Sequence, residues 1–244
     1  MKFLIVTCNK TKHILPAFDW QFEKYVEGNM FERHIIDLGD EPVATWTQNV
    51  YKRIKDIEDE FVVLSLDDYL IIDWFDECVF RDVICEMYND ETIGRYELGF
   101  GGGRKANILG SGGSYHKYDQ NMQYRVSCQI SVWRTSYLMK FLSQNWSIWD
   151  FEVQGSKMSN NDGMEVIATK ENYALRWIEE SALSARHPGR VNLLGMRISD
   201  VYDLIDNGII EKDVIQFGMA KGGDYKVGML DVLGIGNKYK RFYA

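Results

Sequence analysis

Two adjacent carboxylates, Asp67 and Asp68, follow residues 61–66, a run of apolar or small residues with strong β-propensity. Such a run predicts a strand that is buried on both faces. In open α/β sheets, ligands bind beyond the carboxyl ends of the strands. Two acids at that place can hold a hard divalent cation and, through it, the phosphates of a nucleotide. Adjacent acids after a strand also form solvated turns and helix N-caps, so the pair alone leaves both interpretations open.

A second pair of carboxylates, Asp150 and Glu152, flanks Phe151 and follows Trp149. If a helix begins here, the positive end of its dipole favours the ionised form of both acids. A capped helix start with an aromatic side chain packed beside it would have the same pattern.

The remaining sequence predicts alternating strands and helices, which is typical of an α/β fold with a mostly parallel sheet. The first strand, residues 2–7, ends in a polar loop that contains Cys8 and Asn9. Further strands are expected at 61–66, 124–133, 165–169 and 173–178, and helices at 45–57, 74–87, 135–143 and from 199 to about 207. Residues 99–113 are rich in glycine but match neither GxxxxGK[ST] nor GxGxxG, which favours a mobile loop, a plausible lid, over a phosphate-binding loop.

Composition limits the class of protein. The chain has 244 residues, a formal net charge of −8 and an aromatic content of 14%. It contains no apolar run long enough to cross a bilayer and no signal-peptide pattern at its start. The four cysteines form no CxxC pair, which argues against a zinc site and for reduced thiols in a cytoplasm, or a host cytoplasm for a viral protein. The acidic charge disfavours non-specific nucleic-acid binding.

The order of these features resembles a known family. After the first strand, the helix and the acidic strand come a Ser-x-x-Ile-x-x-Trp-Arg segment, a Tyr-Leu pair and a Trp-acid-Phe-Glu segment. They are residues 127–134, Tyr137 with Leu138, and residues 149–152. Over residues 1–190 the chain resembles the small bacterial and viral glycosyltransferases of the GT-A fold, which transfer a sugar from a nucleotide-diphosphate donor.

The resemblance implies a fold and a division of the chain. The fold is a Rossmann-like, mixed but mostly parallel sheet flanked by helices. Residues 1–194 would form the catalytic domain, with a donor half at about 1–100 and an acceptor half at about 101–194. Residues 195–244 lie beyond the resemblance, and their glycines and aromatic residues predict a small C-terminal extension of helix and loop packed on that domain.

The resemblance also implies roles on the donor side. Thr7, Cys8 and Asn9 match the loop that holds the base and ribose of the donor. Asp67 would face the donor, and Asp68 would bind a divalent cation, Mn²⁺ or Mg²⁺. Beyond the motif matches, Arg53 and His187 are candidates for the donor phosphates, and His187 is also a candidate metal ligand.

On the acceptor side, one of Asp150 and Glu152 would be the general base of an inverting displacement. Trp133 and Trp149 are candidates for stacking on the sugar or on the acceptor substrate. The expected reaction moves a hexose such as glucose, from a UDP-sugar, to an acceptor hydroxyl. That hydroxyl belongs either to a glycan or to a hydroxymethylated base of viral DNA, flipped into the site, with residues 104–117 and 238–241 on the phosphates.

Two other classes of function stay open. A sugar-phosphate nucleotidyltransferase would share the sheet, the acids and the metal, but residues 7–14 contain no glycine. A non-catalytic binding module would use the acids only for structure.

Overall fold

The computed structural model describes residues 1–26, 28, 30–99, 108–109, 115–169, 174–179, 191–192, 197–210 and 215–216. Within these residues, the main sheet has eight strands in the order β2-β1-β3-β8-β5-β9-β7-β6. From one edge to the other, they are β2 (Glu32–Asp37), β1 (Lys2–Thr7), β3 (Phe61–Leu66), β8 (Ser131–Arg134), β5 (Ile93–Glu97), β9 (Glu165–Thr169), β7 (Tyr115–Tyr118) and β6 (Ile108–Leu109).

The sheet is mixed, with most of its strands in one direction. β2, β1 and β3 pair in parallel, and β5 pairs in parallel with β9. β8 is antiparallel to both β3 and β5, and β7 is antiparallel to β9 and β6. The expected α/β class with a mostly parallel sheet is therefore confirmed.

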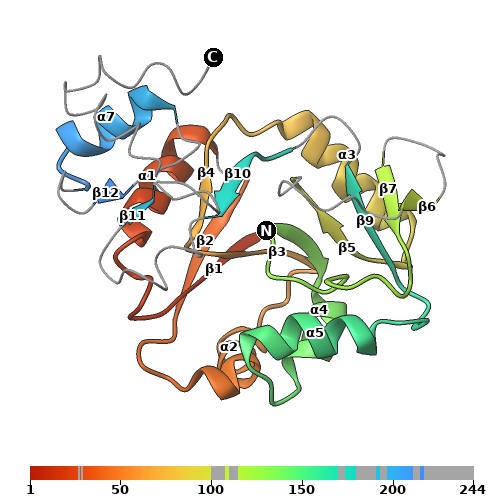
Figure 1. Ribbon diagram of the computed structural model, residues 1–244. Coiled ribbons are helices and arrows are strands. Elements are labelled where there is room, and N and C mark those ends of the chain that lie inside the picture. The colour runs from red at the N-terminus through yellow and green to blue at the C-terminus, as the bar shows by residue number, and fades with distance from the viewer. Residues whose placement is uncertain are drawn as a thin grey trace, which may run out of the picture.

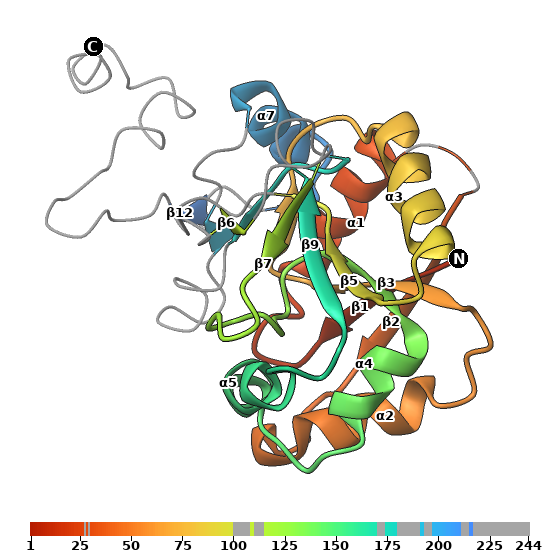
Figure 2. The ribbon, with the colours of Figure 1, turned by 90° about the vertical axis from the view of Figure 1, so that its right-hand side faces the viewer.

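Helices cover both faces of this sheet (Figures 1 and 2). One layer consists of α1 (Leu15–Tyr25) and α3 (Glu77–Asn89). The other consists of α2 (Trp46–Ile54), α4 (Thr135–Leu142) and α5 (Ile148–Met158), with a 3-10 turn at Val43–Thr45 before α2. The helices expected at 45–57, 74–87 and 135–143 are present with shifted ends. In α3, for example, the Asp76 side chain accepts from Val79 N at 3.0 Å and so fixes the helix start.

The two central strands explain why the acids lie where they do. In β3, Phe61 to Ser65 are all buried, as the sequence predicts for a strand covered on both faces. β1 lies beside it in parallel register, with Val6 opposite Leu66, and Thr7 lies opposite Asp37 at the end of β2. The carboxyl ends of three parallel strands therefore meet at one edge, and Asp67 and Asp68 follow one of them.

Two small sheets and one helix complete the described part. β4 (Tyr69–Ile71) pairs with β10 (Trp177–Glu179), and β11 (Val191–Asn192) pairs with β12 (Ile215–Gln216). The helix α7 (Ile198–Asp206) ends before Gly208, whose φ of +66° matches the predicted Asn-Gly stop. The buried carboxylate of Asp200 joins α7 to α1, because it accepts from Lys24 Nζ at 2.9 Å and from the Tyr25 hydroxyl.

The prediction of a strand over residues 124–133 is wrong for most of that segment. Only Ser131–Arg134 forms β8, and Tyr124 has a φ of +61°. Residues 125–133 are all buried, so the polar side chains do not face solvent. They surround Arg95, which donates to Ser127 Oγ at 2.9 Å and Ser131 Oγ at 3.0 Å. The alternation thus reflects a buried polar network instead of a half-exposed strand.

Candidate functional site

A cleft of about 370 Å³ opens beyond the carboxyl ends of β1 and β3. This volume lies in the range of small-molecule sites. Its lining residues come from the ends of β1 to β3, the start of β4, the turn before α2, the buried segment before β8 and the start of α5. They are Val6, Thr7, Cys8, Lys10, Thr11, Leu38, Glu41, Pro42, Val43, Trp46, Leu66, Asp67, Asp68, Tyr69, Cys128, Ile148, Trp149 and Glu152.

Asp67 is fixed at the floor of the cleft. The Thr7 hydroxyl donates to Asp67 Oδ2 at 2.5 Å, and Asp67 N donates to Val6 O at 3.2 Å. Only 2% of Asp67 is exposed. Burial raises the pKa of Asp67 to about 6, although hydrogen bonds from Thr7 and Thr11 act in the opposite direction. A carboxyl group with this pKa changes charge close to neutral pH.

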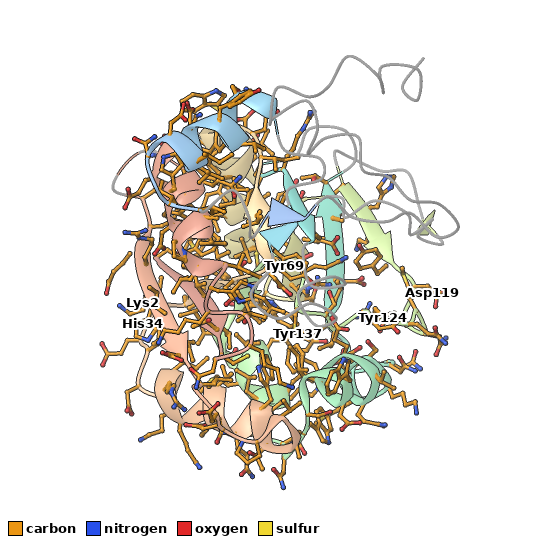
Figure 3. All side chains as sticks on the ribbon, turned by 60° about the vertical axis from the view of Figure 1, so that its left-hand side comes forward. Lys2, His34, Tyr69, Asp119, Tyr124 and Tyr137 are labelled. Atoms are coloured by element: carbon orange, nitrogen blue, oxygen red, sulfur yellow. The ribbon has the colours of Figure 1, made fainter. Side chains whose placement is uncertain are left out.

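Asp68 is also buried, and it leads directly into β4. The next residue, Tyr69, lines the cleft and packs edge-to-face on Trp177 with 4.6 Å between ring centroids. Figure 3 shows Tyr69 toward the middle of the molecule. The β4–β10 pair therefore holds the wall that carries Asp68.

Glu152 lies on the wall formed by α5. Its Oε1 accepts from Cys128 N at 2.9 Å, which fixes the carboxylate against the segment before β8. Burial raises the pKa of the Cys128 thiol well above its ordinary value, and the nearby charges of Glu152 and Asp68 raise it further. The two acidic motifs of the sequence therefore converge on Cys128 in one cleft, and this thiol stays protonated at neutral pH.

Asp150 is placed differently. It is exposed and does not line the cleft. Its Oδ2 accepts from the Ser147 hydroxyl at 2.6 Å, while Asp150 N donates to Ser147 Oγ at 3.1 Å. This reciprocal pair caps α5, so the expected capped helix start applies to Asp150.

The two candidate tryptophans differ in the same way. Trp149 lines the cleft and is 67% exposed, so its indole face is open to a ligand. Trp133 is completely buried and packs against Tyr137, Phe141 and Phe151. The expectation that Trp133 stacks on an acceptor substrate is therefore wrong, because its ring belongs to the core between β8 and the helices.

On the donor side, Thr7 and Cys8 line the cleft, whereas Asn9 and Arg53 do not. Asn9 N donates to Gly39 O at 3.0 Å and ties the first loop to the end of β2. Arg53 forms an ion pair with Glu41 and donates to Asn49 O at 2.9 Å. Arg53 thus contacts the cleft through Glu41, which is a lining residue, and its expected place on donor phosphates is not supported.

The sequence did not single out the segment after β2. Glu41, Val43 and Trp46 all line the cleft. The parallel register of Thr7 with Asp37 brings this segment beside the first loop. The signal that could have found it is the rule that parallel strands end at a common edge.

The carboxylates of the cleft could supply only part of the ligands of a metal ion. Within the described residues, no group of three or more His, Cys, Asp or Glu side chains could hold an ion. Mg²⁺ sites often use one or two carboxylates and complete the shell with phosphate oxygens and water. Asp68, with Asp67 beside it, fits that mode, in which the cation arrives with the nucleotide. His187 lies outside the described residues.

The basic residues proposed for DNA phosphates are largely outside the described part, including Arg104, Lys105 and residues 238–241. Lys117, which the structure describes, lies 3.9 Å from Glu165. Among the described helices, none combines the length and apolar character needed to cross a bilayer.

Comparison with protein families and with curated proteins finds no match. Solved structures give distant similarities. Residues 1–349 of S. aureus TarS are 14% identical over 75% of this chain and 61% of that chain, with a TM-score of 0.46. The complex of the same TarS residues with UDP-GlcNAc is 13% identical over 72% of this chain and 57% of that chain, with a TM-score of 0.43. A UDP-glucose pyrophosphorylase complexed with UDP-glucose gives 11% identity over 76% of each chain, with a TM-score of 0.40. The chain thus spans less than two thirds of the first TarS structure, and values this low carry no argument about function.

Proposed function

We propose that this protein is a glycosyltransferase that binds a nucleotide-diphosphate sugar in the cleft and transfers the sugar to an acceptor hydroxyl. The observation that carries this proposal is the meeting of Asp67 and Asp68 with Glu152 and Trp149 in one cleft of about 370 Å³. Buried acids at a strand end suit a cation with its phosphates, while a carboxylate beside an exposed indole suits a sugar hydroxyl.

The proposed donor binds across the ends of β1 and β3. Thr7 and Cys8 border the space for the nucleoside. Asp67 faces a ribose hydroxyl, and its ionised carboxylate would accept a hydrogen bond from that hydroxyl. Asp68 would hold Mg²⁺ or Mn²⁺ together with the diphosphate. The cation would supply charge neutralisation as the phosphate leaves. A UDP-hexose such as UDP-glucose is the proposed donor.

Glu152 is the proposed general base. Cys128 N holds one of its oxygens, so the carboxylate is oriented before an acceptor substrate arrives. The carboxylate takes the proton of the acceptor hydroxyl, and that oxygen forms a bond to C1 of the sugar. The bond from C1 to the phosphate oxygen breaks, and the nucleoside diphosphate leaves with both electrons. Because attack and departure occur on opposite faces, the configuration at C1 inverts.

A pair of conservative variants tests the base. Glu152→Gln keeps the size and the hydrogen bond to Cys128 N but cannot take a proton. We expect it to bind the donor normally and to lose about 10²–10⁴-fold in transfer rate. Asp150→Asn is the matched control, because its carboxylate lies outside the cleft. Equal activity of Glu152→Gln and the wild type would refute this assignment.

Nucleotidyl transfer is separated from this proposal by the ligand. A nucleotidyltransferase would bind a nucleoside triphosphate and release pyrophosphate, whereas the proposed enzyme releases a nucleoside diphosphate. Measuring which phosphate product forms from a UDP-sugar or from UTP with a sugar phosphate distinguishes the two classes. A binding module would release neither product.

A further inference from the structure

A second cavity, of about 270 Å³, lies along the same helix as Glu152. One wall consists of residues 121–124, and the other consists of Val153, Ser156, Lys157 and Asn160. None of these residues lines the donor cleft. The function proposed above does not use this cavity.

The helix α5 joins the two hollows. Residues three or four positions apart share one face of a helix, so Trp149, Val153 and Lys157 form one row, and Glu152 and Ser156 form the adjacent row. Trp149 and Glu152 line the cleft, while the later members line the second cavity. At 1.5 Å per residue, the distance along the helix from Trp149 to Lys157 is about 12 Å.

The facing segment, residues 124–128, follows the same path. Cys128 N donates to Glu152 at the cleft, and Val126 N donates to Ser156 Oγ at 3.1 Å one turn further on. A Cβ on Gly155 would lie 2.8 Å from Cγ1 of Val126, so glycine permits this close approach. The segment ends at Tyr124, which lies near α5 in Figure 3. Between the cleft and the second cavity, α5 therefore packs directly on this segment, and a ligand that reaches both would lie over the exposed row Trp149, Val153 and Lys157.

The second cavity has the chemistry of a site for hydroxyl-rich chains. The side chain amides of Asn121 and Gln123 and the ammonium of Lys157 offer hydrogen-bond donors to hydroxyl oxygens. Tyr124, which lines this cavity, is 37% exposed, and Trp149, which lines the cleft at the other end of the path, is 67% exposed. Tyr124 also has a φ of +61°, a backbone conformation that is uncommon for non-glycine residues and is found at ligand sites.

We propose that this cavity is a distal subsite for a glycan acceptor of several sugar units, whose reacting hydroxyl lies at Glu152. The inference rests on the proposed function for the position of the reacting end. It names the acceptor substrate as an extended carbohydrate instead of a single flipped DNA base. The length of the path along α5 requires a ligand longer than one sugar.

Chemical-shift mapping on the isotope-labelled full chain tests the subsite without requiring turnover. The probes are maltotetraose, cellotetraose and chitotetraose, the corresponding monosaccharides, and a hydroxymethylcytosine-containing DNA duplex. We expect at least one tetrasaccharide to shift the Trp149 indole and the backbone amides of Tyr124 and Lys157, while its monosaccharide shifts only the cleft end. The proposal would be overturned if no tetrasaccharide shifts the amides around Lys157, or if only the DNA duplex shifts them.

A variant pair sharpens the result. Lys157→Ala removes the ammonium of the distal cavity, and Lys52→Ala removes an exposed lysine of α2 outside both hollows. We expect Lys157→Ala to weaken tetrasaccharide binding about tenfold, an effect typical of one lost charge-assisted hydrogen bond, and Lys52→Ala to leave it unchanged. Equal affinities of the two variants would contradict the role of Lys157.

Titrating the same sample with UDP-glucose and UDP-GlcNAc separates the two claims. Donor-induced shifts at the cleft without tetrasaccharide shifts at Lys157 would leave the transferase proposal standing and remove the distal subsite. Tetrasaccharide shifts without donor shifts would remove the transferase proposal and leave only a carbohydrate-binding site at this cavity.

Discussion

The Thr7 hydroxyl donates a 2.5 Å hydrogen bond to the carboxylate of Asp67, a residue 60 positions later in the chain. This contact joins the carboxyl ends of β1 and β3 at the floor of the cleft. It orients one oxygen of Asp67, while burial keeps the charge of that carboxylate costly. The carboxylate at the floor of the proposed donor site is therefore held in place before a ligand binds, and its burial in the charged form lowers the free energy of unfolding.

The first prediction concerns this effect of Asp67 on the free energy of unfolding. The folded pKa of Asp67, about 6, lies above the ordinary value for an aspartate, so the folded state holds the proton more tightly than the unfolded state. The stability contributed by the protonated form is complete below about pH 4 and is lost as the pH rises through 6, by about 3 kcal/mol at most. Asp67→Asn should remove this loss, so the variant should gain stability relative to the wild type as the pH rises from 4 to 7.

Urea unfolding at several pH values measures this difference. Asp37→Asn is an opposite control, because the hydrogen bond from Lys12 lowers the pKa of Asp37, and its contribution is present above the unfolded pKa and lost in acid. A pH-independent difference between Asp67→Asn and the wild type would contradict the assigned pKa.

The second prediction uses the cysteines as probes of the cleft. Cys8 is half-buried and lines the cleft, whereas Cys78 and Cys85 are exposed on α3. A bound nucleotide sugar should slow alkylation of Cys8 by about tenfold or more at ligand concentrations well above its Kd. Mass spectrometry of iodoacetamide-treated protein reads all three sites in one sample. Protection of Cys78 and Cys85 together with Cys8 would indicate a general effect instead of a ligand in the cleft.

The third prediction compares the two tryptophans. Trp133→Ala removes a fully buried ring and should lower the free energy of unfolding by about 3–5 kcal/mol. Trp149→Ala removes an exposed ring and should change stability by less than about 0.5 kcal/mol, while raising the KM for the acceptor substrate. Denaturant unfolding and steady-state kinetics check the pair. Unchanged acceptor KM in Trp149→Ala would remove this residue from the site.

The fourth prediction concerns the attachment of α7. Asp200 is buried between Lys24 and Tyr25, so Asp200→Ala leaves their donors without this carboxylate and should cost about 1–3 kcal/mol. Hydrogen exchange of amides in α7 should then become faster, while exchange in β1 and β3 stays slow. Asp206→Ala, at an exposed position of the same helix, should change neither. Equal acceleration throughout the chain would show that α7 is part of the main cooperative unit.

Local patterns predicted much of the fold and the main cleft. The apolar run before Asp67, the first strand with its polar loop, and the Asn-Gly end of α7 all formed as expected, because each depends on nearest neighbours and burial. The segment 124–133 did not form the expected strand. Its alternation of apolar and polar residues cannot reveal that the polar side chains are buried and accept hydrogen bonds from Arg95 on another strand. The burial of Trp133 and the ion pair of Arg53 with Glu41 also depend on contacts between distant segments, which no local pattern reports.

The fifth prediction tests the central claim, which is that the cleft binds a nucleotide sugar through Asp68 and a divalent cation. Isothermal titration of UDP-glucose and UDP-GlcNAc, with and without Mn²⁺, should be done on the wild type and on Asp68→Asn. We expect saturable binding that requires the cation in the wild type and at least a tenfold loss of affinity in Asp68→Asn. Absence of binding by either UDP-sugar, or equal binding by Asp68→Asn, would contradict the account.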